Sequence, residues 1–333
     1  TSRCSSAASD VYKRQVEAFY NACRHRGVQI VQDRGCASSG FICPFHGWCY
    51  GLEGENTFVY SPELFRAENL DPSELSLRPF RVEIWGGSAF INHDADAAPL
   101  RESLGPFAPA MEAFDVENMR VEWWESTVLP VNWRLAVGIF LEGYHVRTTH
   151  PQLVPPGSRG ATTYMRSRPD GNSASNQGGS ADSRAQVDDF LHYLRALGEG
   201  MGGMVHEREI QIAESLRDAE LPNPATASSD FNHLVEAALT EWGGATGVPV
   251  PDFDNIARQG VKSGVWFAFP HFFLLPVYAS ASAYRVRPLG PEETLFEIWS
   301  LTTYAPGDEP PAPTTPVPMA GDDERWPLIP AQD

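Results

Sequence analysis

The stretch Leu141-Glu142-Gly143-Tyr144-His145-Val146-Arg147-Thr148-Thr149-His150 decides how the rest of the chain is interpreted. It holds two histidines five residues apart, and a carboxylate stands three residues before the first of them. Because residues three apart share a helix face, a helix here would project Glu142 and His145 in the same direction. His150 stays within reach if the helix loosens or ends near Pro151. Two imidazoles from one segment and a carboxylate from elsewhere form the facial ligand set of non-haem iron.

A second group of metal-binding residues lies upstream. Cys23-Arg24-His25 and Cys43-Pro44-Phe45-His46 each offer one thiolate and one imidazole, and seventeen residues separate them. In a Rieske [2Fe–2S] cluster two cysteines hold one iron and two histidines hold the other. A structural zinc site uses the same ligand types, but zinc fingers usually keep the cysteines in one pair and the histidines in the other. The mixed pairs therefore favour a Rieske cluster over zinc.

In these two places the chain resembles the large (alpha) subunit of a Rieske non-haem iron oxygenase of the ring-hydroxylating type. Asn21 to Gly27 and Cys43 to Trp48 resemble its two cluster loops. Asn132-Trp133-Arg134, followed by Glu142 to Pro151, resembles its iron-binding helix. The resemblance runs from about Val16 to the end of the sequence.

The resemblance implies an α+β chain in which an all-β Rieske [2Fe–2S] domain, residues 16–100, precedes a catalytic mononuclear iron domain, residues 101–333. The catalytic domain is expected to be a helix-grip (START-like) fold, with a curved antiparallel sheet around a long helix. The N-terminal part of the first domain and the C-terminal part of the second are expected to be missing. Residues 1–15, rich in Ser and Ala, are interpreted as a non-native scar.

Local patterns predict individual elements of both domains. Alternating apolar residues on either side of Gly86-Gly87 predict a hairpin, and a second hairpin is predicted around Gly290. Helical spacing predicts helices over residues 187–197, 207–216 and 232–242. The Ser-, Gly-, Asn- and Asp-rich stretch 166–186 is expected to be a loop, and the proline-rich stretch 305–318 a linker.

The resemblance also implies the roles of particular residues. A [2Fe–2S] cluster is expected on Cys23, His25, Cys43 and His46, and mononuclear Fe(II) on His145, His150 and a late aspartate. The Gln-Asp pair that ends the sequence makes Asp333 the expected third ligand, close to both histidines. Asp322 and Asp323 are weaker candidates, because their surroundings indicate a solvated acidic turn. Glu142 is expected to accept a hydrogen bond from an iron-ligand histidine and one from a cluster histidine of a neighbouring subunit.

The implied function is that of an oxygenase component. Electrons from a ferredoxin or an NAD(P)H-dependent reductase would pass through the cluster to the iron, where O₂ is activated. The substrate is expected to be a hydrophobic, aromatic small molecule that is mono- or dioxygenated, or demethylated, in a pocket lined by Phe140, Leu141 and residues 261–277. The expected assembly is a homotrimer or an α3β3 complex. A Rieske electron-transfer protein without oxygenase activity and a zinc-stabilised binding protein are the alternatives.

Composition limits the possible partners and the compartment. The 333 residues carry a net charge of −18, which argues against binding to nucleic acid or to an anionic membrane surface. No apolar run has the length of a membrane span. Five cysteines without regular spacing argue against a disulfide framework, so Cys36 and Cys49 are interpreted as packed thiols in a reducing cytoplasm.

Overall fold

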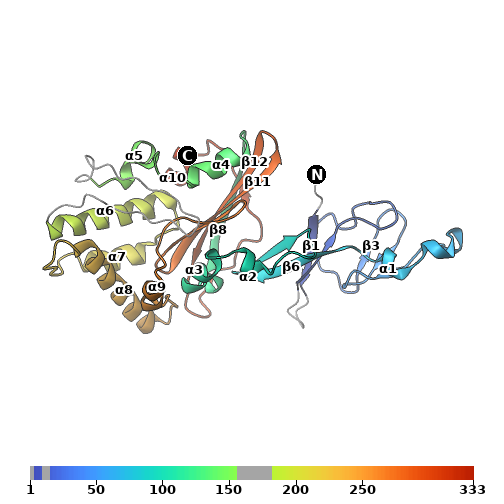
Figure 1. Cartoon of the computed structure of the whole chain (residues 1–333), viewed down its shortest axis with the longest axis horizontal. Helices are drawn as coiled ribbons and strands as arrows, with labels where there is room; N and C mark the ends of the chain where they lie inside the picture. The colour runs from blue at the N-terminus through green and yellow to red at the C-terminus, as the bar shows by residue number, and fades with distance from the viewer. Residues whose placement is uncertain (1–3, 10–15, 156–181) are drawn as a thin grey trace. The chain divides into compact units, whose positions relative to one another are not determined.

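A computed structural model describes residues 4–9, 16–155 and 182–333, and for residues 4–9 only the backbone. The chain divides into two compact units, Thr1–Ser103 and Leu104–Asp333. Figure 1 shows strands dominating the first unit, and a sheet with helices packed on it in the second. The α+β class predicted from the sequence is therefore confirmed.

Two small antiparallel sheets build the first unit. One has the strand order β1-β2-β6-β7 and the other β3-β4-β5. Their bounds are β1 Cys4–Ser9, β2 Val16–Tyr20, β3 Phe41–Ile42, β4 Cys49–Tyr50, β5 Asn56–Phe58, β6 Pro79–Trp85 and β7 Ser88–Asn92. The helices described here are short: η1 Pro62–Leu64, η2 Ala67–Asn69, α1 Pro72–Leu75 and α2 Leu100–Ser103. Strand β1 lies within the segment interpreted as non-native, and it pairs with β2.

The hairpin predicted across Gly86-Gly87 is present. Trp85 pairs with Ser88, and the two glycines between them have φ angles of 54° and 70°. Positive φ at both central residues is what a two-residue turn of this twist requires, and glycine adopts it without a side-chain clash.

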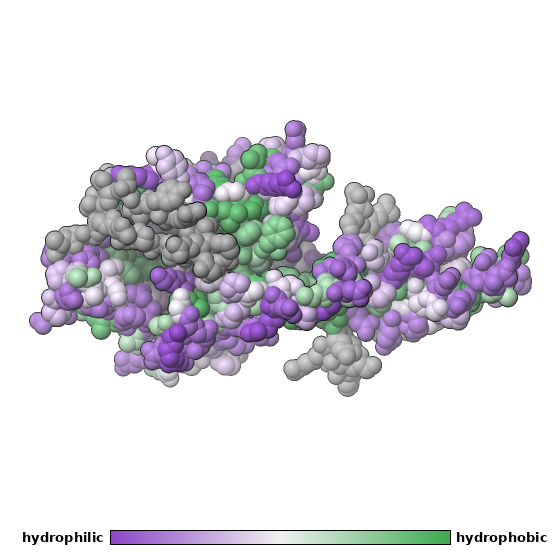
Figure 2. Space-filling model, viewed as in Figure 1, coloured by the Kyte–Doolittle hydropathy of each residue, from purple (hydrophilic) through white to green (hydrophobic). Residues whose placement is uncertain are grey.

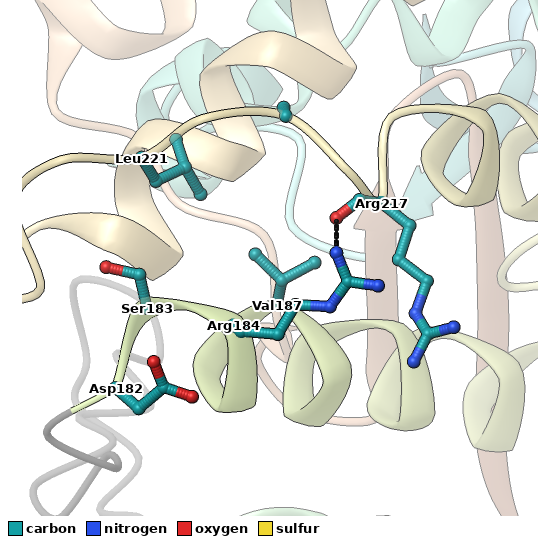
Figure 3. A pocket seen from close by; sticks show the side chains of 7 residues that line it. Asp182, Ser183, Arg184, Val187, Arg217 and Leu221 are labelled. Atoms are coloured by element: carbon teal, nitrogen blue, oxygen red, sulfur yellow. Dashed lines mark hydrogen bonds between the residues drawn. The ribbon is translucent and has the colours of Figure 1, made fainter.

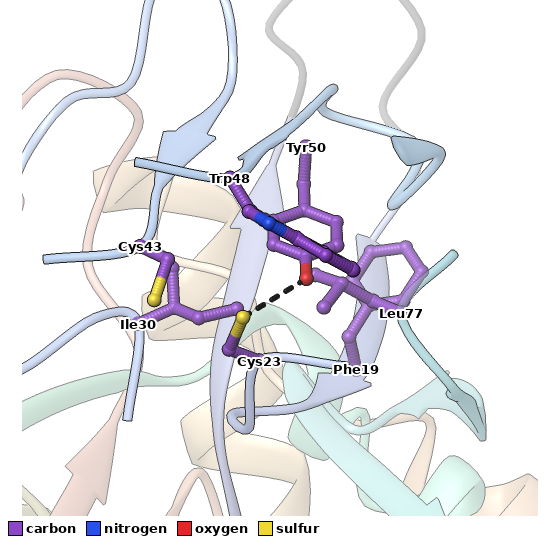
Figure 4. Packing of buried hydrophobic residues seen from close by; sticks show 7 residues of the cluster. All are labelled: Phe19, Cys23, Ile30, Cys43, Trp48, Tyr50 and Leu77. Atoms are coloured by element: carbon purple, nitrogen blue, oxygen red, sulfur yellow. Dashed lines mark hydrogen bonds between the residues drawn. The ribbon is translucent and has the colours of Figure 1, made fainter. Parts of the chain in front are cut away.

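The core of the first unit surrounds two cysteines. Cys23 and Cys43 are buried at 3% and 2% exposure, and apolar side chains pack around them (Figure 4). The other buried members are Phe19, Ile30, Trp48, Tyr50 and Leu77. The two expected ligand thiols are thus part of the packed interior.

The interpretation of Cys36 as a packed thiol was wrong, because its side chain is exposed. It lies in a loop whose residues 32 to 39 are all exposed, whereas Ile30 and Cys43 on either side of that loop enter the core. Cys49 is half-buried, and no disulfide joins any of the four cysteines whose side chains are described.

A six-stranded sheet organises the second unit. Its order is β13-β8-β12-β11-β10-β9, and every pairing is antiparallel except that of β13 with β8. The bounds are β8 Arg120–Leu129, β9 Trp266–Ala268, β10 Phe272–Val277, β11 Ser280–Gly290, β12 Glu293–Thr302 and β13 Val317–Pro318. The hairpin predicted around Gly290 is the β11–β12 pair, in which Gly290 pairs with Glu293.

Helices pack on this sheet. Their bounds are α3 Phe107–Ala113, η3 Val116–Asn118, α4 Trp133–Phe140, α5 Val146–Thr149, η4 Pro151–Leu153, α6 Ser183–Met201, α7 Glu207–Ser215, α8 Ala227–Thr246, α9 Phe253–Gln259 and α10 Leu328–Gln332. Helix α6 packs against α7, α8 and α10, and Figure 1 shows α6, α7 and α8 gathered on one side of the sheet. The three helices predicted from spacing are confirmed as α6, α7 and α8.

The ends of α6 follow from two residues. The Asp182 carboxylate accepts a hydrogen bond from the Ala185 N–H, which caps the free amide groups of the first turn. Gly202 ends the helix with a left-handed φ of 63°. The predicted loop 166–186 lies mostly outside the described residues, but its last four residues are the first turn of α6, because Asp182 caps the helix there. Within the described ranges, no helix combines the length and apolarity that a lipid bilayer would require.

A polar network lies under α7, on the face of the sheet that the helices cover. His206 Nε2 lies 2.6 Å from Glu122 Oε2, and His206 Nδ1 lies 2.9 Å from Ser280 Oγ. The Ser280 hydroxyl lies 2.9 Å from Glu209, which is fully buried. Burial raises the pKa of Glu209. Burial would also raise the pKa of Glu122, but hydrogen bonds from His206 and Tyr304 outweigh it and lower the pKa to about 2.

Candidate metal centres

The two loops of the first unit share one backbone pattern. The Cys23 N–H donates to Val28 O at 2.8 Å, and the Gly27 N–H donates back to Cys23 O at 2.8 Å. The same two hydrogen bonds recur in the second loop: the Cys43 N–H donates to Trp48 O at 2.8 Å, and the Gly47 N–H donates to Cys43 O at 3.0 Å. Gly27 and Gly47 have φ of 68° and 70°, a conformation that glycine adopts without strain. Each loop is therefore a closed turn that presents its cysteine and its histidine together.

The four predicted cluster ligands meet between these loops. The His25 and His46 rings lie 4.7 Å apart, and both cysteine side chains lie in the shared core. The His25 ring also stacks on Trp48 with centroids 4.9 Å apart and planes 9° apart. The two loops thus bring together His25 with His46 and Cys23 with Cys43, as the cluster prediction requires.

Unsatisfied groups indicate that this site suits a metal cluster. His25 Nδ1 is buried and has no hydrogen-bond partner in the described part of the chain. Burial lowers the pKa of His25, with further contributions from His46 and Arg26, and so favours the neutral imidazole that can bind metal. Burial raises the pKa of the Cys23 thiol, which disfavours the thiolate until a cation is present.

Tyr50 is a neighbour of the site that motif analysis missed. Its hydroxyl lies 3.2 Å from Cys23 Sγ and accepts a hydrogen bond from the Arg24 N–H at 3.0 Å. The side chain is 1% exposed, and Figure 4 shows it beside Trp48 and Leu77. Tyr50 follows Cys43 by seven residues, and this spacing gives no sign of its contact with Cys23. That contact depends on how the two loops pack.

The motif of the second unit is not one helix, contrary to the expectation for Glu142 and His145. Helix α4 ends at Phe140, and a separate short helix, α5, follows at Val146–Thr149. The Glu142 carboxylate accepts hydrogen bonds from the N–H groups of Tyr144 and His145, at 2.5 and 3.2 Å. Because the side chain takes these donors, it favours the start of a new turn over continuation of α4.

Glu142 still reaches His145, by a different route from the one predicted. Its Oε1 lies 2.5 Å from His145 Nδ1. Burial would raise the pKa of Glu142, but the hydrogen bond from His145 and the one from the Tyr144 N–H outweigh it and lower the pKa. The carboxylate is therefore ionised near neutral pH, and it orients the His145 ring.

His145, His150 and Asp333 form a group whose possible ligand atoms all lie within 4.8 Å of one another. Asp333 Oδ1 lies 2.8 Å from His150 Nε2 and 3.7 Å from His145 Nε2. The two rings are 5.2 Å apart and nearly perpendicular, at 81°. Two imidazoles and one carboxylate at this separation suit a single divalent ion such as iron(II). The predicted proximity of Asp333 to both histidines is confirmed.

Helix α10 brings Asp333 to this place. Its Ile329 is buried against α6, where a Cβ atom on Gly200 would come within 2.7 Å of Ile329 Cδ1. The absence of a side chain on Gly200 therefore lets α10 lie close to α6. The weaker candidate Asp323 pairs instead with Arg325 at 2.6 Å, and Asp322 does not belong to the metal-sized group found among the described residues.

Both histidines are held through their second ring nitrogen. His150 Nδ1 lies 2.8 Å from Gln332 Oε1, as His145 Nδ1 lies against Glu142. Burial would lower the pKa of His150, but the hydrogen bonds to Asp333 and Gln332 outweigh it and raise the pKa. Sequence reasoning missed the contact of Gln332, although the Gln-Asp pair had directed attention to its neighbour.

Aromatic side chains lie near the three-residue group. The Phe140 ring contacts Tyr284, Phe273 and Phe296 at centroid distances of 4.8, 5.3 and 5.9 Å. Tyr284 is buried, and the charge of Asp333 contributes to its raised pKa after the larger effect of burial. Phe140, one of the residues predicted to line the substrate pocket, is thus packed into an aromatic cluster near Asp333. Phe273, from the stretch 261–277 that was also predicted to line the pocket, belongs to the same cluster.

A surface pocket of about 400 Å³ lies elsewhere, at the start of α6 (Figure 3). Its lining includes Arg184 and Arg217, whose charges pair with Asp218 and Asp188 at 2.6 and 2.8 Å. Both guanidinium groups are thus engaged in ion pairs, and the lining includes none of the three grouped residues.

Comparison with known proteins agrees with both centres. The model of the family "Ring hydroxylating alpha subunit (catalytic domain)" matches residues 115–317, and the model of the "Rieske [2Fe-2S] domain" matches residues 6–64. The oxygenase subunit of carnitine monooxygenase from Escherichia coli (strain K12) is 34% identical over 138 residues, 41% of this chain and 36% of that protein. The chain thus spans about a third of the length of this relative.

Two solved structures share the fold at low identity. The apo form of a quaternary ammonium Rieske monooxygenase has a TM-score of 0.52 and 16% identity, over 90% of this chain and 60% of that one. Naphthalene 1,2-dioxygenase with bound indole has a TM-score of 0.52 and 20% identity, over 89% and 60%. The two domains together imply a Rieske [2Fe–2S] cluster and a mononuclear iron. The chain belongs to the family of ring-hydroxylating alpha subunits, with a Rieske domain before its catalytic domain.

Proposed function

We propose that the chain is the oxygenase component of a Rieske non-haem iron oxygenase, which takes electrons through a cluster on Cys23, His25, Cys43 and His46. We assign the mononuclear iron to His145, His150 and Asp333. The observation that carries the proposal is the approach of Asp333 to both histidines. An electron-transfer protein without oxygenase activity has no need for a second metal site of this kind.

The side chains around the iron site have separate tasks in this proposal. When bound, the cluster supplies single electrons and the iron supplies open positions at which O₂ reacts. One carboxylate and two neutral imidazoles leave an iron(II) site with a net charge of +1. Glu142 holds the Nδ1 proton of His145 and adds negative charge next to that site. The burial of His150 and the nearby aromatic rings keep bulk water away from one side of the site.

For the substrate we favour a small molecule with a quaternary ammonium group. Carnitine monooxygenase is among the sequence relatives, and aromatic rings such as the half-buried Phe140 attract such cations. A net charge of −18 also favours the approach of a cation. The second candidate is an apolar aromatic substrate, which the same rings could contact and which naphthalene 1,2-dioxygenase accepts, as its name states.

We further propose that a ferredoxin or an NAD(P)H-dependent reductase supplies the electrons, and that subunits assemble as a homotrimer or an α3β3 complex. Exposed aromatic residues lie next to the ligands of each centre: Phe45 precedes His46 and is 58% exposed, and Tyr144 precedes His145 and is 78% exposed. Figure 2 shows further hydrophobic surface over α4 and the β11–β12 hairpin, where Leu135 and Leu289 are exposed. A contiguous exposed apolar patch is typical of an interface. If the protein sediments as a monomer and is fully active in that state, the proposed assembly is contradicted.

The iron content of the purified chain and its turnover test the proposal. We expect three irons per chain and a visible cluster spectrum, whereas an electron-transfer protein would hold two irons and a zinc protein would be colourless. With a reductase, NAD(P)H and O₂, oxidation of carnitine or of naphthalene identifies the substrate class. His145→Ala should lose one iron and all turnover while keeping the cluster spectrum. If His145→Ala retained three irons and turnover, the assigned site would be wrong.

A further inference from the structure

The two histidines of the proposed iron site are held by acceptors of different kinds. His145 Nδ1 faces a carboxylate, Glu142, whereas His150 Nδ1 faces the side-chain amide of Gln332 at 2.8 Å. Gln332 immediately precedes Asp333, whose carboxylate lies on the opposite side of the His150 ring, 2.8 Å from Nε2. Gln332, the last residue of α10, and Asp333, which follows it, thus contact the two nitrogens of the His150 ring.

A second donor contacts the same oxygen of Gln332. The amide nitrogen of Gln152, Nε2, lies 2.7 Å from the same Gln332 Oε1. An amide oxygen only accepts, and its two lone pairs can receive both the Gln152 N–H and the His150 N–H. Because that oxygen carries no hydrogen, His150 Nδ1 must be the donor. A metal ion that displaces the proton of Nε2, the nitrogen that faces Asp333, then binds the lone pair on that atom.

The second donor is itself held in place. Gln152 belongs to η4, directly after His150, and its backbone oxygen accepts a hydrogen bond from His192 Nε2 at 2.9 Å. His192 lies in α6, the helix on which α10 packs. The hydrogen bonds from His192 through Gln152 to Gln332 therefore connect α6, η4 and α10 around His150.

We propose that Gln332 is a positioning residue: it fixes His150 in the tautomer and ring orientation that turn Nε2 towards the metal, and Gln152 fixes the amide of Gln332. The inference rests on the proposed iron site. It concerns the geometry of a ligand rather than its charge. A neutral amide can hold the Nδ1 proton without adding a second negative charge beside Asp333.

The test compares Gln332→Met, which keeps the length of the side chain but has no amide acceptor, with Gln332→Glu, which keeps an acceptor oxygen. Co²⁺ is the probe, titrated anaerobically into the chain whose cluster is intact. We expect Gln332→Met to weaken Co²⁺ binding about 10–100-fold, as the loss of such outer hydrogen bonds typically does. Gln332→Glu should bind Co²⁺ within a few-fold of the original chain. Gln211→Ala, which removes an exposed amide on α7, is the matched control.

Proton NMR of the Co²⁺-loaded chain gives a readout that a purely structural role would not change. Each histidine bound through Nε2 shows a shifted, solvent-exchangeable Nδ1–H signal, so we expect two such signals. Gln332→Met should lose or rapidly exchange the His150 signal and retain that of His145. Unchanged affinity and two slow signals in Gln332→Met would overturn the positioning role. If His150→Ala also bound Co²⁺ as tightly as the original chain, the proposed iron site itself would fail, and this inference with it.

Discussion

Replacement of Tyr50 by phenylalanine should lower the reduction potential of the cluster. The substitution removes one hydroxyl, which lies 3.2 Å from Cys23 Sγ, and leaves the ring in the core. Once Cys23 binds iron as a thiolate, its sulfur can only accept, so the Tyr50 hydroxyl must donate. Reduction adds negative charge to the cluster and strengthens this bond, so the hydroxyl stabilises the reduced form.

The size of the shift follows from the burial of the contact. Tyr50 is 1% exposed, so no water can replace the lost hydroxyl. A hydrogen bond to a charged group contributes about 1.5–3 kcal/mol. If about half of this differs between the two redox states, the difference is ~1 kcal/mol, and the potential of this one-electron couple falls by about 40 mV.

The assay is a redox titration followed by the visible absorption of the cluster. Tyr60→Phe is the matched control, because Tyr60 belongs to the same unit but is 62% exposed. Tyr50→Phe also leaves the Arg24 N–H without its acceptor, so stability should fall by about 1–3 kcal/mol, measured separately by urea unfolding. A potential that rises, or that stays within about 10 mV of the original value, would refute the reasoning.

Three further predictions concern the two centres and the sheet. Cys23→Ser should abolish the visible cluster spectrum, whereas Cys49→Ser should keep it. Asp333→Ala should lose most of the iron(II) affinity of the catalytic unit in anaerobic titrations, and unchanged affinity would remove Asp333 from the site. Glu122, with a pKa of about 2 against an ordinary 4.5, should contribute about 3 kcal/mol of stability above pH 4.5 through its hydrogen bonds from His206 and Tyr304, and this is lost as the pH falls towards 2. In urea unfolding from pH 7 to 3, the stability difference between the original chain and Glu122→Gln should shrink as the pH falls; a constant difference would contradict the assignment.

The sequence by itself determined the ligand types and their grouping in short segments. Cys23 and His25 are two residues apart and Cys43 and His46 three apart, so a closed turn is enough to present each pair. The same holds for His145 and His150, which stayed close even though the expected helix was interrupted at Phe140. Contacts of this range depend on local backbone geometry, which residue types and spacing largely determine.

Tertiary structure alone decided the contacts between distant segments. Gln332 lies 182 residues from His150 along the chain. The two side chains are in contact because Ile329 packs α10 against α6 beside Gly200. The Gln-Asp pair indicated Asp333 only through likeness to a family, and nothing in the spacing indicated the role of Gln332. Tyr50 likewise reaches Cys23 only once the two cluster loops share one core. Such contacts result from the packing of many side chains at once, and short motifs do not encode that packing.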